Sequence, residues 1–593
     1  MSYRLGIALL LSSFALSACR SLPGIPHKIE AVPPQHIIYI DTHGRLVDPT
    51  GDIKCYQGDD WQEQFGKELT KHGFSYVPHL SSKPCRGTVL GLNNLDLRNS
   101  KDYLDDIFSA MHGYHNKKFI NDPERLYKRR VAIIVHGGLN SNSGNIEAAR
   151  DITLKMLNDP NAPYPIFINW QSNLWGSLWD HIVKVRQGDS KGYRHSFLAP
   201  FYLAADLAKG IGRAPATWFY HYSNDLDRIK KRRNRRRNPE RQTQEDKIYC
   251  DLRREYTECL AEKGSPCDVF RISKGPFWHT TAEGARSTTR NGLTNVIPVR
   301  YYSTAFGGPT GKAYTWLPLK LLVAPLLDGL GTSAWDTMIR HVQVGFHNDG
   351  VEDLQDKDRI MEEPRPRTDA FPEGDGGVAR FMRRLREEIE NTSRNCGADP
   401  DHPCLQWELT LIGHSMGSIM ANHILFEFGD GPEFKNIVYM AAAASVNDYE
   451  HTALEYLKKH TETQMYHLTL HDFAEIRDQY AWEVPPSGSL LVWIDNFLSK
   501  PATLRDRTVG RYVNLMLALP ATPRNLRSRI HVKTFGVGEV LEWSDPQHHG
   551  DFNDFLGQPS PTGLRAKFWD SEFWKPDVKD RPSAREQCPN ESP

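Results

Sequence analysis

Six short strand-like runs, all from residue 131 onward, constrain the fold of this chain more than any other feature of its sequence. Each run is four to six residues long, and several are followed by segments with helical spacing. Near-continuous apolar strands that alternate with helices are typical of a parallel sheet covered on both faces. The sequence therefore predicts an α/β fold, with a mostly parallel sheet and helices on both faces. The predicted strands are Val131–Val135, Pro165–Trp170, Leu409–Ile412, Ile437–Ala441, Tyr466–Leu470 and Ile530–Phe535.

A long stretch, about 171–405, separates the second predicted strand from the third. It is too large for one crossover, so we expect a large insertion carried by the sheet. It contains a basic run at 230–237, which is either a solvated loop or a contact to anionic lipid headgroups or nucleic acid. The apolar segment Trp316–Leu330 is interrupted by Pro318 and Pro325 and is too short to span a bilayer. We expect this segment to be a buried helix or loop, or else a lid or wall of an acyl-chain pocket.

The first residues indicate export. Arg4 precedes a short apolar run, Leu5–Leu16, and the run closes with Leu16-Ser17-Ala18-Cys19. Such a run suits a signal peptide better than a spanning helix of about 20 residues. Small residues before a cysteine resemble the bacterial lipobox, which implies that residues 1–18 are removed and that Cys19 is acylated. The alternative is an ordinary secretory signal with an incidental cysteine.

The resemblance to lipoproteins also implies a location. Arg20, rather than an aspartate, follows the cysteine, and in known lipoproteins this favours the outer membrane, here facing the periplasm. Residues 19–36 are rich in proline and polar groups and are expected to tether the lipid to the folded protein. Residues 37–130 follow as an N-terminal extension with a short strand-like run, Ile37–Ile40. Residues 131–593 are expected to form the main domain with its insertion.

Composition narrows the partners and cofactors. The formal net charge is zero, which argues against a general nucleic-acid binder. Eight cysteines remain besides Cys19, and an even number in an oxidising compartment permits up to four disulfides, whose pairing stays open. The sequence has no C-x-x-C spacing and no glycine-rich phosphate loop after a strand, so we expect no metal and no cofactor. The eight are Cys55, Cys85, Cys250, Cys259, Cys267, Cys396, Cys404 and Cys588.

One turn carries the most specific chemical signal. Strand Leu409–Ile412 leads directly into Gly413-His414-Ser415-Met416-Gly417. A G-x-S-x-G turn between a strand and a helix presents its serine as a nucleophile, and the glycines are needed because the turn is tight. We expect Ser415 at the carboxyl edge of the sheet with its hydroxyl exposed; the alternative is a serine in an ordinary turn. The helix is indicated by apolar residues at Ala421, Ile424, Leu425 and Phe428.

A second turn offers hydrogen-bond donors. The predicted strand Val131–Val135 runs into His136-Gly137-Gly138, where glycines let backbone N–H groups approach a substrate oxygen. This resembles the oxyanion loop after the third strand of α/β-hydrolases. That resemblance implies one donor from Gly137 or Gly138 and one from the amide of Met416. The alternative is a tight turn without a chemical role.

A serine hydroxyl needs a base near neutral pH. The last predicted strand is followed by Gln547-His548-His549-Gly550-Asp551-Phe552, and either imidazole could reach Ser415 from such a loop. We favour His549, because His-Gly-Asp-Phe resembles the terminal histidine loop of bacterial α/β-hydrolases. His548 stays open, and so does a surface histidine pair or half of a metal site.

The third member of a triad orients the imidazole and stabilises its cation. Asp472 follows the predicted strand Tyr466–Leu470, where the α/β-hydrolase fold places its acid, and it is our candidate. The rivals are expected to be solvated carboxylates. They are Glu475, Asp478, Asp495 and Asp448.

The chain thus resembles the α/β-hydrolases, and more closely the serine esterase or lipase type found among bacterial lipoproteins. The resemblance covers about 131–170 and 405–555. It implies acyl transfer from an ester or lipid to water. Ser415 attacks the ester carbonyl, His549 takes and then returns the proton, and Asp472 orients the imidazole of His549. A peptidase or amidase would use the same groups, and a non-catalytic binding or scaffolding lipoprotein on an inactivated fold is the alternative class.

Overall fold

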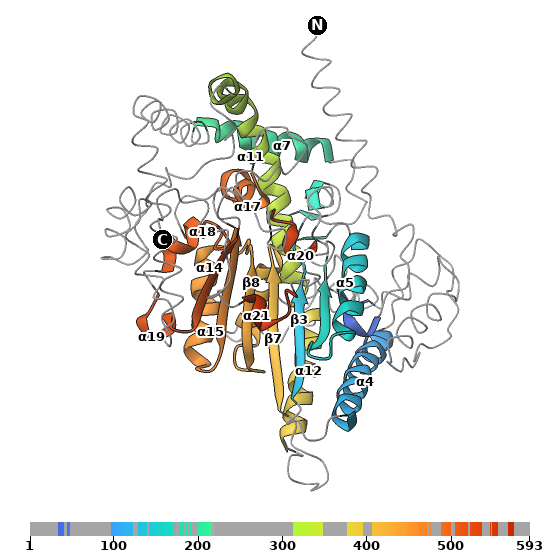
Figure 1. Cartoon of the computed structure of the whole chain (residues 1–593). Helices are drawn as coiled ribbons and strands as arrows, with labels where there is room; N and C mark the ends of the chain where they lie inside the picture. Colours follow the sequence, from blue (N-terminus) through green and yellow to red (C-terminus); the bar gives the residue numbers. More distant parts are fainter. Residues whose placement is uncertain are drawn as a thin grey trace, which may run out of the picture. The chain divides into compact units, whose positions relative to one another are not determined.

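The structure is a computed structural model of the whole chain (Figure 1), and its described residues divide into two compact units. The first unit comprises Met1–Tyr202, Ala334–Leu411 and Glu427–Phe434, and the second comprises Leu203–Ser333, Ile412–Phe426 and Lys435–Pro593. The residues described are 34–40, 44, 46–47, 97–121, 128–138, 142–170, 172, 177–178, 181–182, 185–186, 189–190, 199–215, 218, 312–347, 376–394, 406–470, 475, 488–499, 505–519, 522–535, 546, 548–554 and 567–574.

Several predicted features lie outside the described residues. They are the signal peptide 1–18, Cys19, most of the tether, the basic run 230–237, the eight other cysteines, Asp472 and Asp478. The predictions about export, acylation, disulfides and the triad acid therefore stay predictions.

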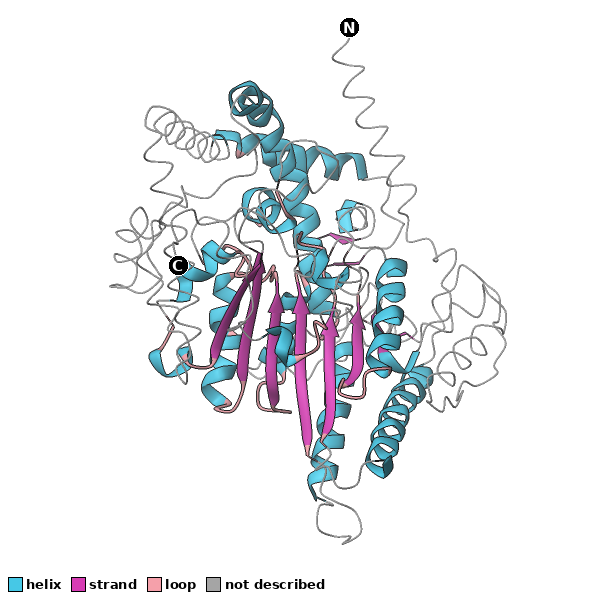
Figure 2. Cartoon of the chain, in the orientation of Figure 1, coloured by secondary structure: helices cyan, strands magenta, loops and turns pink. Residues whose placement is uncertain are grey.

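In the first unit, described strands of the large sheet lie in the order β7-β3-β4-β1-β2; strands are magenta in Figure 2. β3 (Arg129–Val135) runs parallel to β4 (Tyr164–Asn169), which runs parallel to β1 (Ile37–Ile40). β2 (Leu46–Val47) closes this edge in the antiparallel direction. β1 comes from the segment that the sequence assigned to an N-terminal extension, so part of that extension belongs to the sheet.

Helices of the first unit include α4 (Leu97–Asn121), α5 (Asn142–Leu157) and α12 (Gly377–Arg394). α5 contacts β4, and α12, which comes from the predicted insertion, contacts β1 and β2. Consecutive residues of β3 and β4 are buried. Because successive side chains of a strand point to opposite faces, both faces of this part of the sheet are covered.

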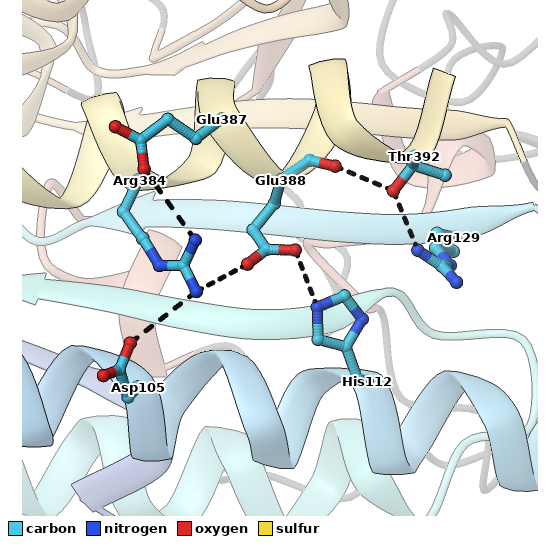
Figure 3. Close-up of polar contacts among 7 residues, drawn as sticks. All are labelled: Asp105, His112, Arg129, Arg384, Glu387, Glu388 and Thr392. Atoms are coloured by element: carbon cyan, nitrogen blue, oxygen red, sulfur yellow. Dashed lines mark hydrogen bonds and ion pairs between the residues drawn. The ribbon is translucent and has the colours of Figure 1, made fainter. Parts of the chain in front are cut away.

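A polar network joins α4 to α12 (Figure 3). The guanidinium of Arg384 lies 2.8 Å from Glu388 and 3.6 Å from Asp105, and Nε2 of His112 lies 3.0 Å from the other Glu388 oxygen. Arg384 also lies over the ring of Phe108, which stacks on Phe381. Apolar packing and shared carboxylate contacts thus fix α4 against α12.

The second unit contains the end of β7 (Trp407–His414), β8 (Phe434–Met440), β9 (Gln464–Leu470) and β10 (Ile530–Phe535), in the order β10-β9-β8-β7. β8, β9 and β10 run parallel. The boundaries of all six predicted strands agree with the structure to within three residues. The α/β class and its mostly parallel sheet are confirmed.

Short helices follow the strands of the second unit. They are α13 (Gly417–Glu427), α14 (Val446–His451), α15 (Ala453–Lys459), α17 (Leu490–Trp493), the π-helix η6 (Ile494–Leu498), α18 (Tyr512–Ala518), α19 (Arg524–Arg527), α20 (Asp551–Asp554) and α21 (Ser571–Trp574). The four residues that predicted a helix after the G-x-S-x-G turn are all buried, although Phe428 lies just beyond the end of α13.

The predicted insertion forms two longer helices, α7 (Ala199–Gly212) and α11 (Lys312–Val344), and a small hairpin of β5 (Val185–Arg186) and β6 (Asp189–Ser190). The apolar segment Trp316–Leu330 lies within α11, so it is a helix despite its two prolines. Among the described helices, none combines the length and the apolarity required to cross a bilayer.

Candidate active site

Ser415 stands at the junction of β7 and α13. The strand continues through Gly413 and His414, two residues further than the sequence predicted, and α13 begins at Gly417. Ser415 has a φ of 50°, a left-handed conformation that is uncommon for a residue with a side chain. The sharp change of chain direction turns the serine out of the strand, as a nucleophile turn requires.

Backbone hydrogen bonds hold Ser415 in this conformation. Its N–H donates to the carbonyl of Met440 at 2.8 Å, and its carbonyl accepts from the N–H of Ala443 at 2.9 Å. The hydroxyl of Ser418 donates to the same carbonyl at 2.7 Å and accepts from the N–H of Ala444 at 3.0 Å. The loop after β8 and the first turn of α13 therefore fix Ser415 from two sides.

Gly413, two residues before Ser415, is required by close packing. A Cβ atom on Gly413 would lie 2.9 Å from Cα of Ser418 and 3.0 Å from the carbonyl oxygen of Gly417. These distances are shorter than real Cβ contacts, so any side chain would push α13 away from β7. The clash that the sequence predicted for a side chain in this turn is confirmed at Gly413.

The base candidate that contacts the nucleophile is His549. Its Nε2 lies 2.8 Å from Oγ of Ser415, within the range in which an imidazole accepts a proton from a hydroxyl. His548 points to solvent instead, and its backbone N–H donates to the carboxylate of Asp551 at 2.8 Å. The pairing of Ser415 with His549 therefore resolves the choice that the sequence left between two neighbouring imidazoles.

The expectation of an exposed hydroxyl is wrong. Ser415 is 1% exposed and His549 is 8% exposed. The cause is the loop that carries His549, which packs against the turn: Nε2 of His414 lies 3.1 Å from the carbonyl of His549, and the ring of Phe552 lies 6.1 Å from that of His414. Ser415 is at the end of the strand, as predicted, but beneath the loop that carries His549.

Burial also affects the protonation of His549. The pKa of His549 lies well below its ordinary value of 6.5, first because burial disfavours the imidazolium and second because of the charge of the neighbouring His414. His549 is therefore neutral near pH 7, the state in which Nε2 accepts a proton.

The acid of a triad is not placed by the described residues, because Asp472 lies outside them. Two of its rivals are engaged elsewhere. Asp495 accepts from the N–H of Thr508 at 2.9 Å, from Arg511 at 3.2 Å and from Asn514 at 2.9 Å. Glu475 accepts from the hydroxyl of Ser489.

Asp495 and Glu475 are 0% exposed, so the expectation that they are solvated carboxylates is wrong. A neighbouring arginine or hydroxyl, which sequence spacing does not reveal, explains how a carboxylate is accommodated in the interior. Asp448 is exposed in the first turn of α14, as expected.

The loop of Gly137 and Gly138 lies in the first unit. The carbonyl of Gly137 accepts from Nδ1 of His136 at 2.6 Å and from the hydroxyl of Ser172 at 3.3 Å. Nε2 of His136 accepts from the N–H of Trp170 at 3.2 Å. Because a trans peptide directs its C=O and N–H to opposite sides, the N–H of Gly138 points away from this carbonyl.

By binding the carbonyl of Gly137, the ring of His136 fixes the peptide whose N–H belongs to Gly138. Burial lowers the pKa of His136 to about 4, although hydrogen bonds to Gly137 and Asn169 act in the other direction. The neutral ring has one donor and one acceptor nitrogen: Nδ1 donates to the carbonyl of Gly137, and Nε2 accepts from the N–H of Trp170 and from the side-chain amide of Asn145 at 3.3 Å. That Gly137, Gly138 and Met416 serve as an oxyanion hole stays a prediction.

Sequence reasoning missed two polar contacts of the turn. Ser418 binds both Ser415 and the loop after β8, and His414 binds the carbonyl of His549. His414 was singled out only as a member of the turn. Nothing in the sequence distinguishes Ser418 from an ordinary serine in the first turn of a helix.

In the part of the chain that the structure describes, no group of three or more His, Cys, Asp or Glu side chains is arranged to hold a metal ion. No family model, curated protein or solved structure matches the chain. The function is therefore argued from the site alone.

Proposed function

We propose that the protein is a serine hydrolase that cleaves carboxylic esters, lipids among them, and that its fold is of the α/β-hydrolase type. The observation that carries this proposal is the 2.8 Å contact between Oγ of Ser415 and Nε2 of His549, at a nucleophile with a left-handed backbone. A serine in a strand–turn–helix junction with an imidazole in hydrogen-bond range is the arrangement that activates a hydroxyl.

The reaction proceeds in two halves. His549 takes the Ser415 proton as Oγ attacks the ester carbonyl, and the collapsing intermediate releases an alcohol that receives this proton from Nε2. Water then attacks the acyl-enzyme with His549 again as base, and the carboxylic acid leaves as Ser415 regains its proton. Asp472 is the proposed acid that orients the imidazole.

The developing oxyanion needs donors that are fixed before the reaction. We propose the amide of Met416 as one donor, since it stands directly before α13, where the first N–H groups have no partner within the helix. The N–H of Gly138 is the proposed second donor, because His136 and Ser172 hold the carbonyl of the same peptide.

The proposed setting is a lipoprotein acylated at Cys19 and attached to the outer membrane, facing the periplasm. The support is the sequence Leu16-Ser17-Ala18-Cys19 followed by Arg20. Export would give the enzyme access to envelope lipids and to esters that enter the periplasm.

Labelling with a fluorophosphonate tests the proposal. The folded wild-type protein should form a stable adduct, and Ser415→Ala, which removes only the hydroxyl, should form none. If the folded wild-type protein is not labelled, the alternative of a non-catalytic binding or scaffolding lipoprotein is favoured.

The substrate class needs a second experiment. Acyl esters of increasing chain length and peptide amides should be compared as substrates, with kcat/KM measured for each. We expect turnover of the esters; a preference for amides would identify a peptidase or amidase that uses the same groups.

A further inference from the structure

His414, the residue before the nucleophile, makes an unusual contact for a side chain in this turn. Its Nε2 lies 3.1 Å from the backbone carbonyl of His549, in a buried position, and the two rings are 5.3 Å apart. A carbonyl oxygen only accepts hydrogen bonds, so Nε2 of His414 must carry the hydrogen. The strand that presents the nucleophile thus binds the main chain of the residue that supplies the base.

A second tie fixes the other side of the same residue. The N–H of His548 donates to the carboxylate of Asp551 at 2.8 Å, and the N–H of Asp551 donates to the carbonyl of His548 at 3.1 Å. The backbone of His549 is therefore held through its own carbonyl by His414 and through the preceding residue by Asp551. These ties fix the backbone from which the imidazole reaches Oγ of Ser415 at 2.8 Å.

We propose that His414 is a positioning residue for the base, acting by its hydrogen bond to the carbonyl of His549 and not by contact with the substrate. This positioning role rests on the proposed function, because His549 is a base only if the protein is a serine hydrolase. A displacement of about 1 Å between reacting groups costs on the order of a hundredfold in rate. His414 therefore contributes to kcat, because it fixes the distance over which Ser415 transfers its proton.

Two amide substitutions of similar polarity separate this role from a general packing role. In His414→Gln, the side-chain NH₂ reaches the place of Nε2, so the bond to the carbonyl is retained. In His414→Asn, the amide is one methylene shorter and reaches only the place of Nδ1, so the bond is lost. His531→Asn serves as the control, because His531 is a largely buried histidine of β10 that binds Gln464 rather than the site.

We expect kcat of His414→Asn to fall by about ten- to a hundredfold with KM unchanged within about twofold. His414→Gln should keep kcat at least about tenfold above that of His414→Asn, and the His531→Asn control should keep kcat and KM. Equal losses in the Gln and Asn variants, or no loss in His414→Asn, would overturn the proposal. Thermal unfolding should be measured for each variant, so that rates are compared between folded proteins.

Hydrogen exchange gives a test that does not depend on activity. Peptides covering 548–554 should exchange faster in His414→Asn than in the wild type, and His414→Gln should restore the protection. Unchanged exchange in His414→Asn contradicts the proposal even if the wild type hydrolyses esters. If the wild type is not labelled by a fluorophosphonate but the exchange differs as expected, the proposed function fails and the positioning contact stands.

Discussion

Two histidines of the second unit, His549 in the loop before α20 and His467 in the middle of β9, are both buried and both have a lowered pKa. His549 is 8% exposed and His467 is 0% exposed. Burial is the largest cause of the shift for both, and it lowers the pKa of His467 to about 3. A shifted pKa alone would mark both as functional candidates.

Their surroundings differ. His549 contacts the hydroxyl of Ser415 and, through its carbonyl, His414. His467 lies between two tyrosine rings, 4.9 Å from that of Tyr449 and 5.8 Å from that of Tyr439, and among the described residues neither of its ring nitrogens has a hydrogen-bond partner. Desolvation therefore produces a neutral imidazole in either place, but of the two only His549 lies within hydrogen-bond distance of a serine hydroxyl.

The largest expected difference between the two histidines is in turnover. His549→Gln should lower kcat on an acyl ester by roughly 10⁴-fold, because it removes the group that takes the proton of Ser415. His467→Leu, of similar volume and without polar atoms, should leave kcat/KM within about threefold. Steady-state kinetics on the two purified variants measures both effects. A comparable loss in His467→Leu would contradict the expectation that only His549 takes part in turnover.

Acid stability should depend on His467 even though turnover does not. The unfolded chain has an ordinary histidine pKa of about 6.5, whereas folded His467 stays neutral down to about pH 3. As the pH falls below 6.5, only the unfolded chain binds this proton, so stability is lost; above 6.5 the contribution of His467 is fully present. Between pH 7 and pH 5 this amounts to about 2 kcal/mol.

His467→Leu should remove this part of the pH dependence, so the variant should gain stability over the wild type as the pH falls from 7 to 5. Denaturant unfolding at both pH values gives the difference in the free energy of unfolding. An identical pH dependence in the variant and the wild type would mean that His467 titrates normally in the folded protein.

The smallest effect concerns the pH profile of the wild type. Because the pKa of His549 lies well below 6.5, the base stays neutral in mildly acidic solution. We expect kcat/KM at pH 6 to remain above half of its value at pH 7.5. A histidine with an ordinary pKa would be only roughly one quarter neutral at pH 6. A drop of kcat/KM to about a quarter at pH 6 would therefore contradict the lowered pKa of His549.

Local patterns were sufficient to predict most strands and the nucleophile turn. Strand Ile530–Phe535 has the predicted bounds, and the turn at Ser415 follows from two glycines around a serine between a strand and a helix. These features depend on residues close together in the chain, where the side-chain period and the backbone freedom of glycine act directly. The same reasoning left β1 in an extension, because its pairing with β4 joins residues far apart in the sequence.

The mostly parallel α/β class, the turn that carries Ser415 and a short list of residues that could contact this serine all follow from local sequence patterns. The packing of distant segments shows in addition that His549 rather than His548 contacts the serine, that the serine is buried beneath the histidine loop, and that Asp495 is bound to Arg511. The reason is that a hydrogen bond between residues 415 and 549 depends on packing across the sheet edge. The sequence alone does not distinguish His548 from His549, because their difference lies in which of them packs against Ser415.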